Sequence, residues 1–324
     1  MLKTGEKLGA FIVPTGIGAS VGGYAGDASV WARRFAEHAK LIVNPNVVNA
    51  GGFSGITGNM LYVEGYSLDS FFKGEISLKQ SYGNKIGIVF DKAVPQDVLN
   101  VHINTMNAVK TVYGVDITGY EITSEDAGVE FFMSDVGMSS GRVKNIETLK
   151  AAALKLLNQG ADAIAIVCMF DDPQDDNPDY ANGIGTDPVG GVEAIISHYI
   201  SKELKVPCAH SPAFADYSIS SEIVNPKSAS EYITPTFLPC ILLGLSNAPL
   251  IGGDIDVSLL DFLVMPYNSL GSTPVFEAVK RNIPVFAVKE NTTVLNVTNE
   301  NLFKSSKITV AETYEECLQL IIQS

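Results

Sequence analysis

An acid, a thiol and an imidazole follow one another closely between residues 187 and 210. Glu193 is expected on a helix, and the next predicted strand delivers Cys208 and His210. These are groups that proteins use for proton transfer and nucleophilic attack. His210 is expected at the carboxyl end of its strand, where functional residues of α/β sheets gather. We therefore predict His210, Cys208 and Glu193 as catalytic residues, with no role in a site as the alternative.

A glycine-rich loop follows the first predicted strand and precedes a helix. Gly16, Gly18 and Gly22 allow a close backbone approach or a positive φ, and Asp27 is expected to cap the helix. Helix starts attract phosphate or carboxylate groups. Val21 stands where a dinucleotide fingerprint needs a small residue, and the lysine motif of a P-loop is missing, which disfavours nucleotide cofactors. The loop predicts anion binding, and a tight structural turn is the alternative.

Other polar residues are expected where strands end and helices begin. They would orient a ligand through hydrogen bonds, unless they only shape their own loops through Asx turns. Asp187 and Thr273 are predicted helix N-caps, and each precedes a proline, which is favoured at the first helical position. The predicted ligand-binding residues beyond the glycine loop are Asn44, Asn46, Asn49, Asp187, Asn268, Gly271, Ser272, Thr273 and Glu290.

A metal site is the less favoured interpretation of the acidic residues. Five aspartates in residues 171–179 offer oxygen ligands for Ca²⁺ or Mg²⁺. The EF-hand spacing is absent, so a solvated loop is favoured, with a mobile lid as the alternative. Glu193 and His198 are five residues apart and do not share a helix face well. We predict no cofactor and keep a divalent metal as an open alternative.

Strands and helices alternate along the chain in a way that would bring these loops together. Apolar runs typical of buried parallel strands alternate with helices of roughly 10–15 residues. The clearest strand covers residues 162–169, and the strongest amphipathic helix covers residues 145–159. This pattern predicts an α/β fold with mostly parallel sheets and flanking helices, which can form two Rossmann-like lobes. The other predicted strands cover residues 11–14, 41–43, 60–63, 86–90, 115–122, 207–209, 261–266 and 284–288.

The pattern also divides the chain into three segments. Residues 1–80 form an N-terminal α/β segment with the glycine-rich loop, and residues 81–215 form a central Rossmann-like lobe. Residues 216–324 form a C-terminal α/β segment, which we expect to pack with residues 1–80.

Composition narrows the classes of partner. The chain has 324 residues, of which 46% are hydrophobic, and its formal net charge is −14. An acidic surface repels phosphate backbones and anionic lipids, so nucleic acid and membranes are not expected as partners. The four cysteines show no CxxC pairing, which favours a reducing compartment without disulfides. The N-terminus carries no apolar run of signal-peptide length. We predict a cytoplasmic protein.

Five short motifs resemble an uncharacterised bacterial and cyanobacterial family known by a domain-of-unknown-function label. They are VPTGIG at residues 13–18, GGYAGD at 22–27, YVEGY at 62–66, DPVGG at 187–191 and PCAHSP at 207–212. The resemblance spans most of the chain and implies little chemistry.

A second resemblance, over about half of the chain, is to the aspartate/glutamate racemase and maleate isomerase superfamily. It rests on the strand at residues 86–90 and the stretch GADAIAIVC at residues 160–168. Cys168 matches the first catalytic cysteine of that superfamily by its place at a strand end. The Cys-Asn-Thr pattern is missing, and Tyr267 and Asn268 stand where the second cysteine is expected. The resemblance therefore implies a racemase-like fold and not the two-cysteine mechanism.

Together these features predict an enzyme that acts on a small metabolite carrying a carboxylate or phosphate. It would work by proton transfer, as an isomerase, lyase or hydrolase and not as a redox enzyme. A non-catalytic metabolite-binding protein is the alternative, and a structural or assembly protein with an apolar patch is a third. The expected partner is a small-molecule substrate, and a homo-oligomer is left open.

Overall fold

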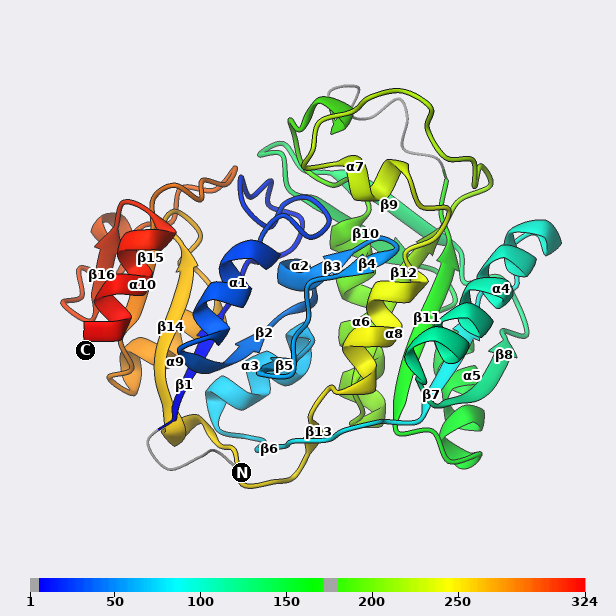
Figure 1. Ribbon diagram of the computed structural model, residues 1–324, viewed down its shortest axis with the longest axis horizontal. Helices are drawn as coiled ribbons and strands as arrows, with labels where there is room; N and C mark the ends of the chain where they lie inside the picture. Colours follow the sequence, from blue (N-terminus) through cyan, green and yellow to red (C-terminus); the bar gives the residue numbers. More distant parts are fainter. Residues whose placement is uncertain (1–5, 172–179, 324) are drawn as a thin grey trace.

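Two parallel β-sheets form the framework of the molecule (Figure 1). The computed structural model describes residues 6–171 and 180–323. The larger sheet has six strands in the order β16-β15-β14-β1-β2-β5, and the smaller has four in the order β12-β11-β7-β8. All pairings within both sheets are parallel. The predicted α/β class is therefore confirmed.

The strands of the larger sheet are β1 (Lys7–Phe11), β2 (Ala39–Val43), β5 (Met60–Tyr62), β14 (Leu260–Pro266), β15 (Val285–Val288) and β16 (Ile308–Ala311). Those of the smaller sheet are β7 (Ile86–Phe90), β8 (Ile117–Ile122), β11 (Ala163–Met169) and β12 (Cys208–Ala213). Three antiparallel pairs lie outside both sheets: β3 (Asn49–Ala50) with β4 (Phe53–Ser54), β6 (Leu78–Lys79) with β13 (Leu250–Ile251), and β9 (Val129–Met133) with β10 (Ser139–Val143).

Helices cover both faces of each sheet. The helices of the larger sheet are α1 (Ser29–Ala36), α3 (Gly65–Lys73), α9 (Thr273–Lys280) and α10 (Tyr314–Gln323). Those of the smaller sheet are α4 (Gln96–Tyr113), α5 (Ile146–Asn158), α6 (Gly190–Leu204) and α8 (Leu238–Ser246). Shorter elements are α2 (Pro45–Val48), α7 (Ala229–Tyr232), two 3₁₀ turns (Tyr180–Asn182 and Val257–Leu259) and a π-helical turn (Asn299–Phe303).

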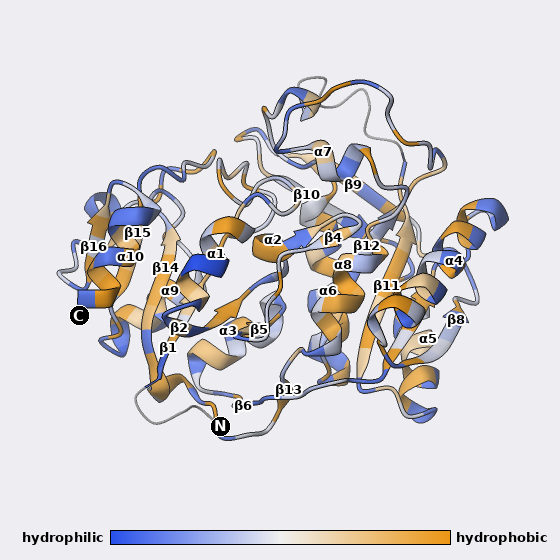
Figure 2. Ribbon diagram, in the orientation of Figure 1, coloured by the Kyte–Doolittle hydropathy of each residue, from blue (hydrophilic) through white to orange (hydrophobic). Residues whose placement is uncertain are grey.

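Continuous apolar strands explain why the sheets are buried on both faces. In β11, Ala165 and Val167 face the core that lies between the two sheets, whereas Ile164 and Ile166 face the core beneath α5 and α6. Successive strand residues point to opposite faces, so a strand that is apolar throughout needs cover on both. Figure 2 shows this apolar character along β11 and β14, and more polar residues in many of the outer loops.

The chain crosses between the sheets twice. The larger sheet takes its strands from residues 1–80 and 216–324, and the smaller sheet takes its strands from residues 81–215. The short pair β6 and β13 joins the two crossings. Helix α8 lies after residue 216 but packs against β11, β12 and α4, so it belongs to the smaller sheet by contact.

The first strand lies earlier than its apolar run predicts. The prediction was residues 11–14, whereas β1 ends at Phe11. Beyond it, the amide of Val13 donates to Asn44 Oδ1 at 3.1 Å, and the Val13 carbonyl accepts from Asn44 Nδ2 at 2.8 Å. The side-chain amide of Asn44 therefore gives the buried N–H and C=O groups of Val13 the hydrogen bonds that a neighbouring strand would otherwise provide.

Over residues 6–171 and 180–323, no helix is both long and apolar enough to cross a membrane.

Candidate functional site

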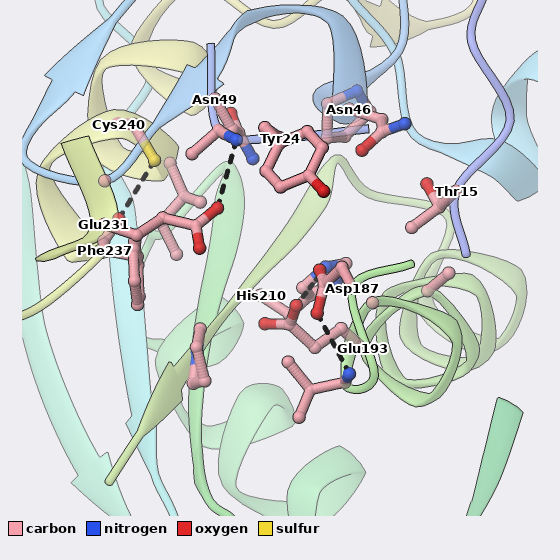
Figure 3. A pocket seen from close by; sticks show the side chains of 18 of the residues that line it. Thr15, Tyr24, Asn46, Asn49, Asp187, Glu193, His210, Glu231, Phe237 and Cys240 are labelled. Atoms are coloured by element: carbon pink, nitrogen blue, oxygen red, sulfur yellow. Dashed lines mark hydrogen bonds and ion pairs between the residues drawn. The ribbon is translucent and has the colours of Figure 1, made fainter. Parts of the chain in front are cut away.

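A cavity of about 970 Å³ lies between the two sheets. Its wall is built from loops that follow β1, β2 and β12, from the starts of α3, α6 and α9, and from the irregular chain around α7. Loops at the carboxyl ends of parallel strands are the usual place for ligands in α/β proteins. Figure 3 shows the polar side chains that several of these elements contribute.

An acid and an imidazole meet in the wall of this cavity. Glu193, in the first turn of α6, is 7% exposed, and its Oε2 lies 3.8 Å from Nε2 of His210 on β12. The Oε1 atom of Glu193 is buried, and it has no hydrogen-bond partner among the described residues. Ser197 lies one turn further along α6, and its Oγ is 3.0 Å from His210 Nδ1. Figure 3 shows the Glu193 and His210 side chains side by side.

The contacts of Ser197 are compatible with a tautomer of His210 in which Nε2 is basic. The Ser197 hydroxyl can donate to the carbonyl of Ala194 at 3.3 Å while its oxygen accepts from His210 Nδ1–H. In this tautomer Nε2 keeps its lone pair and faces Glu193.

Burial keeps both groups uncharged, Glu193 with its proton and His210 without one. Desolvation lowers the pKa of His210 to about 3. Desolvation, followed by the charges of Asp187 and Glu231, raises the pKa of Glu193 well above its ordinary value. At neutral pH the site therefore offers a carboxylic acid that can donate a proton and an imidazole that can accept one.

Two helix starts at the cavity are occupied by the chain's own carboxylates. Glu64 accepts from the amides of Tyr66 and Ser67 at 2.8 and 2.7 Å at the start of α3, and burial raises its pKa to about 7. Asp187 accepts from the amide of Val189 at 3.0 Å before α6, and burial raises its pKa. A ligand anion would have to compete with these carboxylates.

Acids dominate the charge of the wall. Over the described residues, neither lysine nor arginine lines the cavity. The basic side chains that line the cavity in the described part of the chain are those of His198 and His210. The acids that line it are Glu64, Asp69, Asp187, Glu193, Asp216 and Glu231. This charge favours a neutral or cationic ligand over the anion that the sequence predicts.

Most of the glycine-rich loop serves as a structural turn. Gly16 and Gly18 have φ values of +73° and +57° and lie against Ser139 and Thr186. Gly22, with φ +87°, donates to Asp27 Oδ1. None of these three glycines lines the cavity, whereas Gly23, Tyr24 and Ala25 from the same loop do.

The predicted helix caps are shifted in the structure. Asp27 does not cap α1, whose N-cap is Ala28; it accepts from the amides of Gly22 and Tyr24 within its own loop, outside the cavity wall. The N-cap of α6 is Val189 and not Asp187, and that of α9 is Ser272 and not Thr273. In each case the helix begins one or two residues later or earlier than the cap residue type suggests.

The three asparagines after β2 line the cavity but are largely used by the fold. Asn44 and Asn46 donate to the carbonyl of Val13, and Asn49 accepts from the hydroxyl of Tyr62 at 3.1 Å. Their bonds match the loop-shaping alternative, although their side chains stay within reach of a ligand.

Ser272 is the one residue that lines the cavity among the predicted ligand-binding residues near the C-terminus, which are Asn268, Gly271, Ser272, Thr273 and Glu290. Asn268 donates to the carbonyls of Thr293 and Leu295 and fixes that loop. The remaining members lie elsewhere: Gly271 packs against Val297, Thr273 bonds to Asp69, and Glu290 accepts from the amide of Tyr314.

The four cysteines are buried, and Cys240 alone among them lines the cavity. Cys208 is buried outside the cavity wall, and burial raises its pKa, so its thiol is not placed as a nucleophile. Burial also raises the pKa of Cys168, the racemase-like position. Cys240, which the sequence did not single out, lines the cavity; its thiol donates to the carbonyl of Phe237 at 3.0 Å, and burial raises its pKa to about 12.

Sequence reasoning also missed Glu231 and the tyrosines beside it. Glu231 Oε1 accepts from the amide of Ala25 at 3.0 Å and from the Tyr180 hydroxyl at 3.0 Å. Burial and the charge of Asp187 raise the pKa of Glu231 to about 8. The rings of Tyr24 and Tyr180 stack with centroids 4.7 Å apart. A glutamate between Ser230 and Tyr232, in a segment without periodicity, gave no signal by itself.

In the parts of the chain that the structure describes, no group of three or more His, Cys, Asp or Glu side chains is arranged to hold a metal ion. The predicted acidic loop at residues 171–179 lies, except for Asp171, outside the described residues.

Comparison with known proteins gives a family but no activity. A family model described as "Protein of unknown function (DUF3326)" matches residues 9–324. An uncharacterised lipoprotein of Synechococcus sp. is 38% identical over 298 residues, which cover 88% of this chain and 82% of that protein. No solved structure matches the chain. The first resemblance drawn from the sequence is thereby confirmed, and the second, to the racemases, stays a prediction.

Proposed function

The chain belongs to the DUF3326 family, and we propose that it is an enzyme that moves protons on a small polar metabolite held in the cavity between the sheets. The observation that carries the proposal is the pair Glu193 and His210, buried in the cavity wall with Oε2 and Nε2 3.8 Å apart. Pairs of titratable groups whose surroundings push their pKa values apart are typical of acid–base sites.

The pair supports a balanced cycle of proton transfer. His210 Nε2 takes a proton from one atom of the substrate, and the carboxylic acid of Glu193 gives a proton to another. The substrate loses one proton and gains one, which is an isomerisation. If the protonated atom leaves with its bonding electrons, the outcome is an elimination, and if His210 instead activates water, it is a hydrolysis. Return of the proton from imidazolium to carboxylate restores both groups.

Hydrogen exchange tests this proposal without knowledge of the substrate. The full chain is incubated in D₂O with amino acids, hydroxy acids, amines and sugar phosphates, and deuterium uptake is followed by mass spectrometry. We expect uptake at one carbon of at least one compound. Glu193→Gln and His210→Asn should each lower the rate by about 10²-fold or more, and Glu37→Gln, at an exposed position of α1's end, should not. Uptake that survives both site variants would contradict the proposal.

A non-catalytic binding protein is the second candidate. It is favoured by a cavity between the two sheets in which the polar side chains of Asn44, Glu64 and Asp187 are already bonded to the fold. A compound that raises the melting temperature but exchanges no hydrogen, in the wild type as in the two variants, would favour this candidate.

Location is a separate proposal. The four cysteines are buried free thiols, which supports the cytoplasm that the sequence predicts. The relative in Synechococcus is named a lipoprotein, which favours a lipid-anchored protein instead. Cell fractionation with an antibody against the native chain decides between the two.

A further inference from the structure

The acids of the cavity differ in how far the fold already satisfies them. Glu64 and Asp187 each accept backbone hydrogen bonds at helix starts. Asp69 bonds to Thr273, and Asp216 accepts from the amide of Ser218. Glu193 differs from all four, because its Oε1 is buried without a partner among the described residues.

An unpartnered oxygen in this position points to a ligand that donates hydrogen bonds. Buried polar atoms almost always have a partner, and leaving one without a partner destabilises the folded state. The Glu193 side chain is directed into the cavity beside His210 (Figure 3). An N–H group of a bound molecule would supply the missing partner.

Glu231 offers a second acceptor from another part of the wall. Its Oε1 accepts hydrogen bonds from the amide of Ala25 and from the hydroxyl of Tyr180, and these bonds fix the carboxyl group at the cavity surface. Tyr24 and Tyr180 line the cavity next to it. Their rings stack on each other, so only the outer face of each ring is left to stabilise an organic cation.

The shape of the wall favours an organic ammonium group over a bare metal ion. Metal ions need three or more ligand atoms within about 2–2.6 Å, and the described acids do not offer such a group. An ammonium group donates three hydrogen bonds over a wider span. Apolar side chains of Ile12, Phe237 and Ile241 also line the cavity and can cover a carbon skeleton.

We propose that the ligand of this cavity is a small aliphatic primary amine whose ammonium group is held by Glu193 and Glu231, with Asp187 adding to the negative field. This inference rests on the proposed function for what happens to the ligand and adds its chemical class. Burial, followed by the charges of Asp187 and Glu231, raises the pKa of Glu193, and burial, followed by the charge of Asp187, raises that of Glu231. A bound ammonium group acts against both shifts and favours the ionised carboxylates that would hold it.

Calorimetry with a matched four-carbon series tests the ligand class. The full chain is titrated with 1,4-diaminobutane, 4-amino-1-butanol, 1,4-butanediol and succinate. We expect both amines to bind and the diol and succinate not to bind. Glu193→Gln and Glu231→Gln keep the side-chain shape and remove the charge, and each should weaken amine binding about tenfold or more. Glu37→Gln changes an exposed acid that does not line the cavity; it is the matched control and should bind as the wild type does.

The outcomes separate this inference from the proposed function. Preference for succinate or the diol, binding of none of the four, or amine binding unchanged in both cavity variants would overturn the amine. If amines bind but none exchanges hydrogen in D₂O, the amine stands and the proton-transfer function falls. If exchange occurs with carboxylates alone, the function stands and the amine falls. Circular dichroism of each variant shows that loss of binding is not loss of folding, and the two variants test the same point independently.

Discussion

Glu193 and His210 owe their charge states to what surrounds them. Each is desolvated by the wall, and the acids that face Glu193 raise its pKa further. Neutral groups in a buried site avoid the large cost of an isolated buried charge. The same burial leaves Glu193 Oε1 without a partner in the described part of the chain, and a ligand that donates a hydrogen bond to this oxygen would offset the cost.

Glu231 should make stability fall as the pH rises above neutrality. Its pKa is raised from 4.5 to about 8 on folding, so between these values the folded state holds a proton that the unfolded state has lost. Stability from this proton is full below about pH 4.5 and is lost as the pH rises through 8. His210 has the opposite effect, because its lowered pKa makes stability rise with pH, but this rise is complete once the pH exceeds the unfolded pKa of 6.5. From pH 7 to 8.5 we expect a loss of about 1 kcal/mol, measured by urea denaturation.

The variant Glu231→Gln isolates this effect because it cannot titrate. Its free energy of unfolding should change less over the same pH interval than that of the wild type. Equal slopes for the two proteins would show that Glu231 does not keep its proton in the folded state.

At the scale of elements, the sequence predicted the sheets and helices well and the cavity only in part. Strand β11 and helix α5 are where continuous apolar runs and 3.6-residue periodicity predict them. Local patterns such as these depend on neighbours in sequence. Whether Asp27 caps a helix depends on the turn at Gly22 that draws its carboxyl away, and residue type does not record that turn.

The charge of the cavity could not be predicted for a related reason. Glu64, Asp187 and Glu231 come from parts of the chain far apart in sequence and face one space only in the fold. The predicted anion site considered each helix start alone, and two of these starts are filled by the chain's own carboxylates. Local strand and helix patterns single out His210 and Glu193, although His210 lies inside β12 and not at its carboxyl end as expected. Glu231 has no such local signal.

The turn at Gly16 should be intolerant of a side chain because it joins two elements. Its carbonyl accepts from the amide of Ser139 on β10 at 2.9 Å. A Cβ at Gly16 would lie 2.5 Å from Ser139 Oγ, whereas Gly83, with a similar φ of +75°, has nothing within 4 Å. Both Gly→Ala changes force alanine into a left-handed backbone conformation, which destabilises both variants. Gly16→Ala should cost about 1–3 kcal/mol more than Gly83→Ala in urea denaturation; equal costs would mean that the β10 contact yields freely.

At the scale of the whole molecule, the two sheets share one core. A single cluster of buried side chains includes Phe11 of β1, Ile88 of β7 and Leu242 of α8, and so spans both sheets. Helix α8 packs on β11 and β12 and also on β4, which follows β2 in the chain. Because neither sheet can lose its cover on this side without exposing the other, we expect the two to unfold together.

Trp31 makes this cooperativity measurable. It is the single tryptophan of the chain, it lies on α1 beside the larger sheet, and it packs against the shared cluster. Ile88, on the smaller sheet, is fully buried in that cluster. Ile88→Ala should lower stability by about 2–5 kcal/mol and should shift the urea midpoint of Trp31 fluorescence together with that of far-ultraviolet circular dichroism. Val112→Ala, at a side chain 71% exposed on α4, is the control and should shift neither. If Ile88→Ala moved the dichroism midpoint while Trp31 fluorescence kept its own, the sheets would be independent folding units and the cavity between them would be an interface free to open.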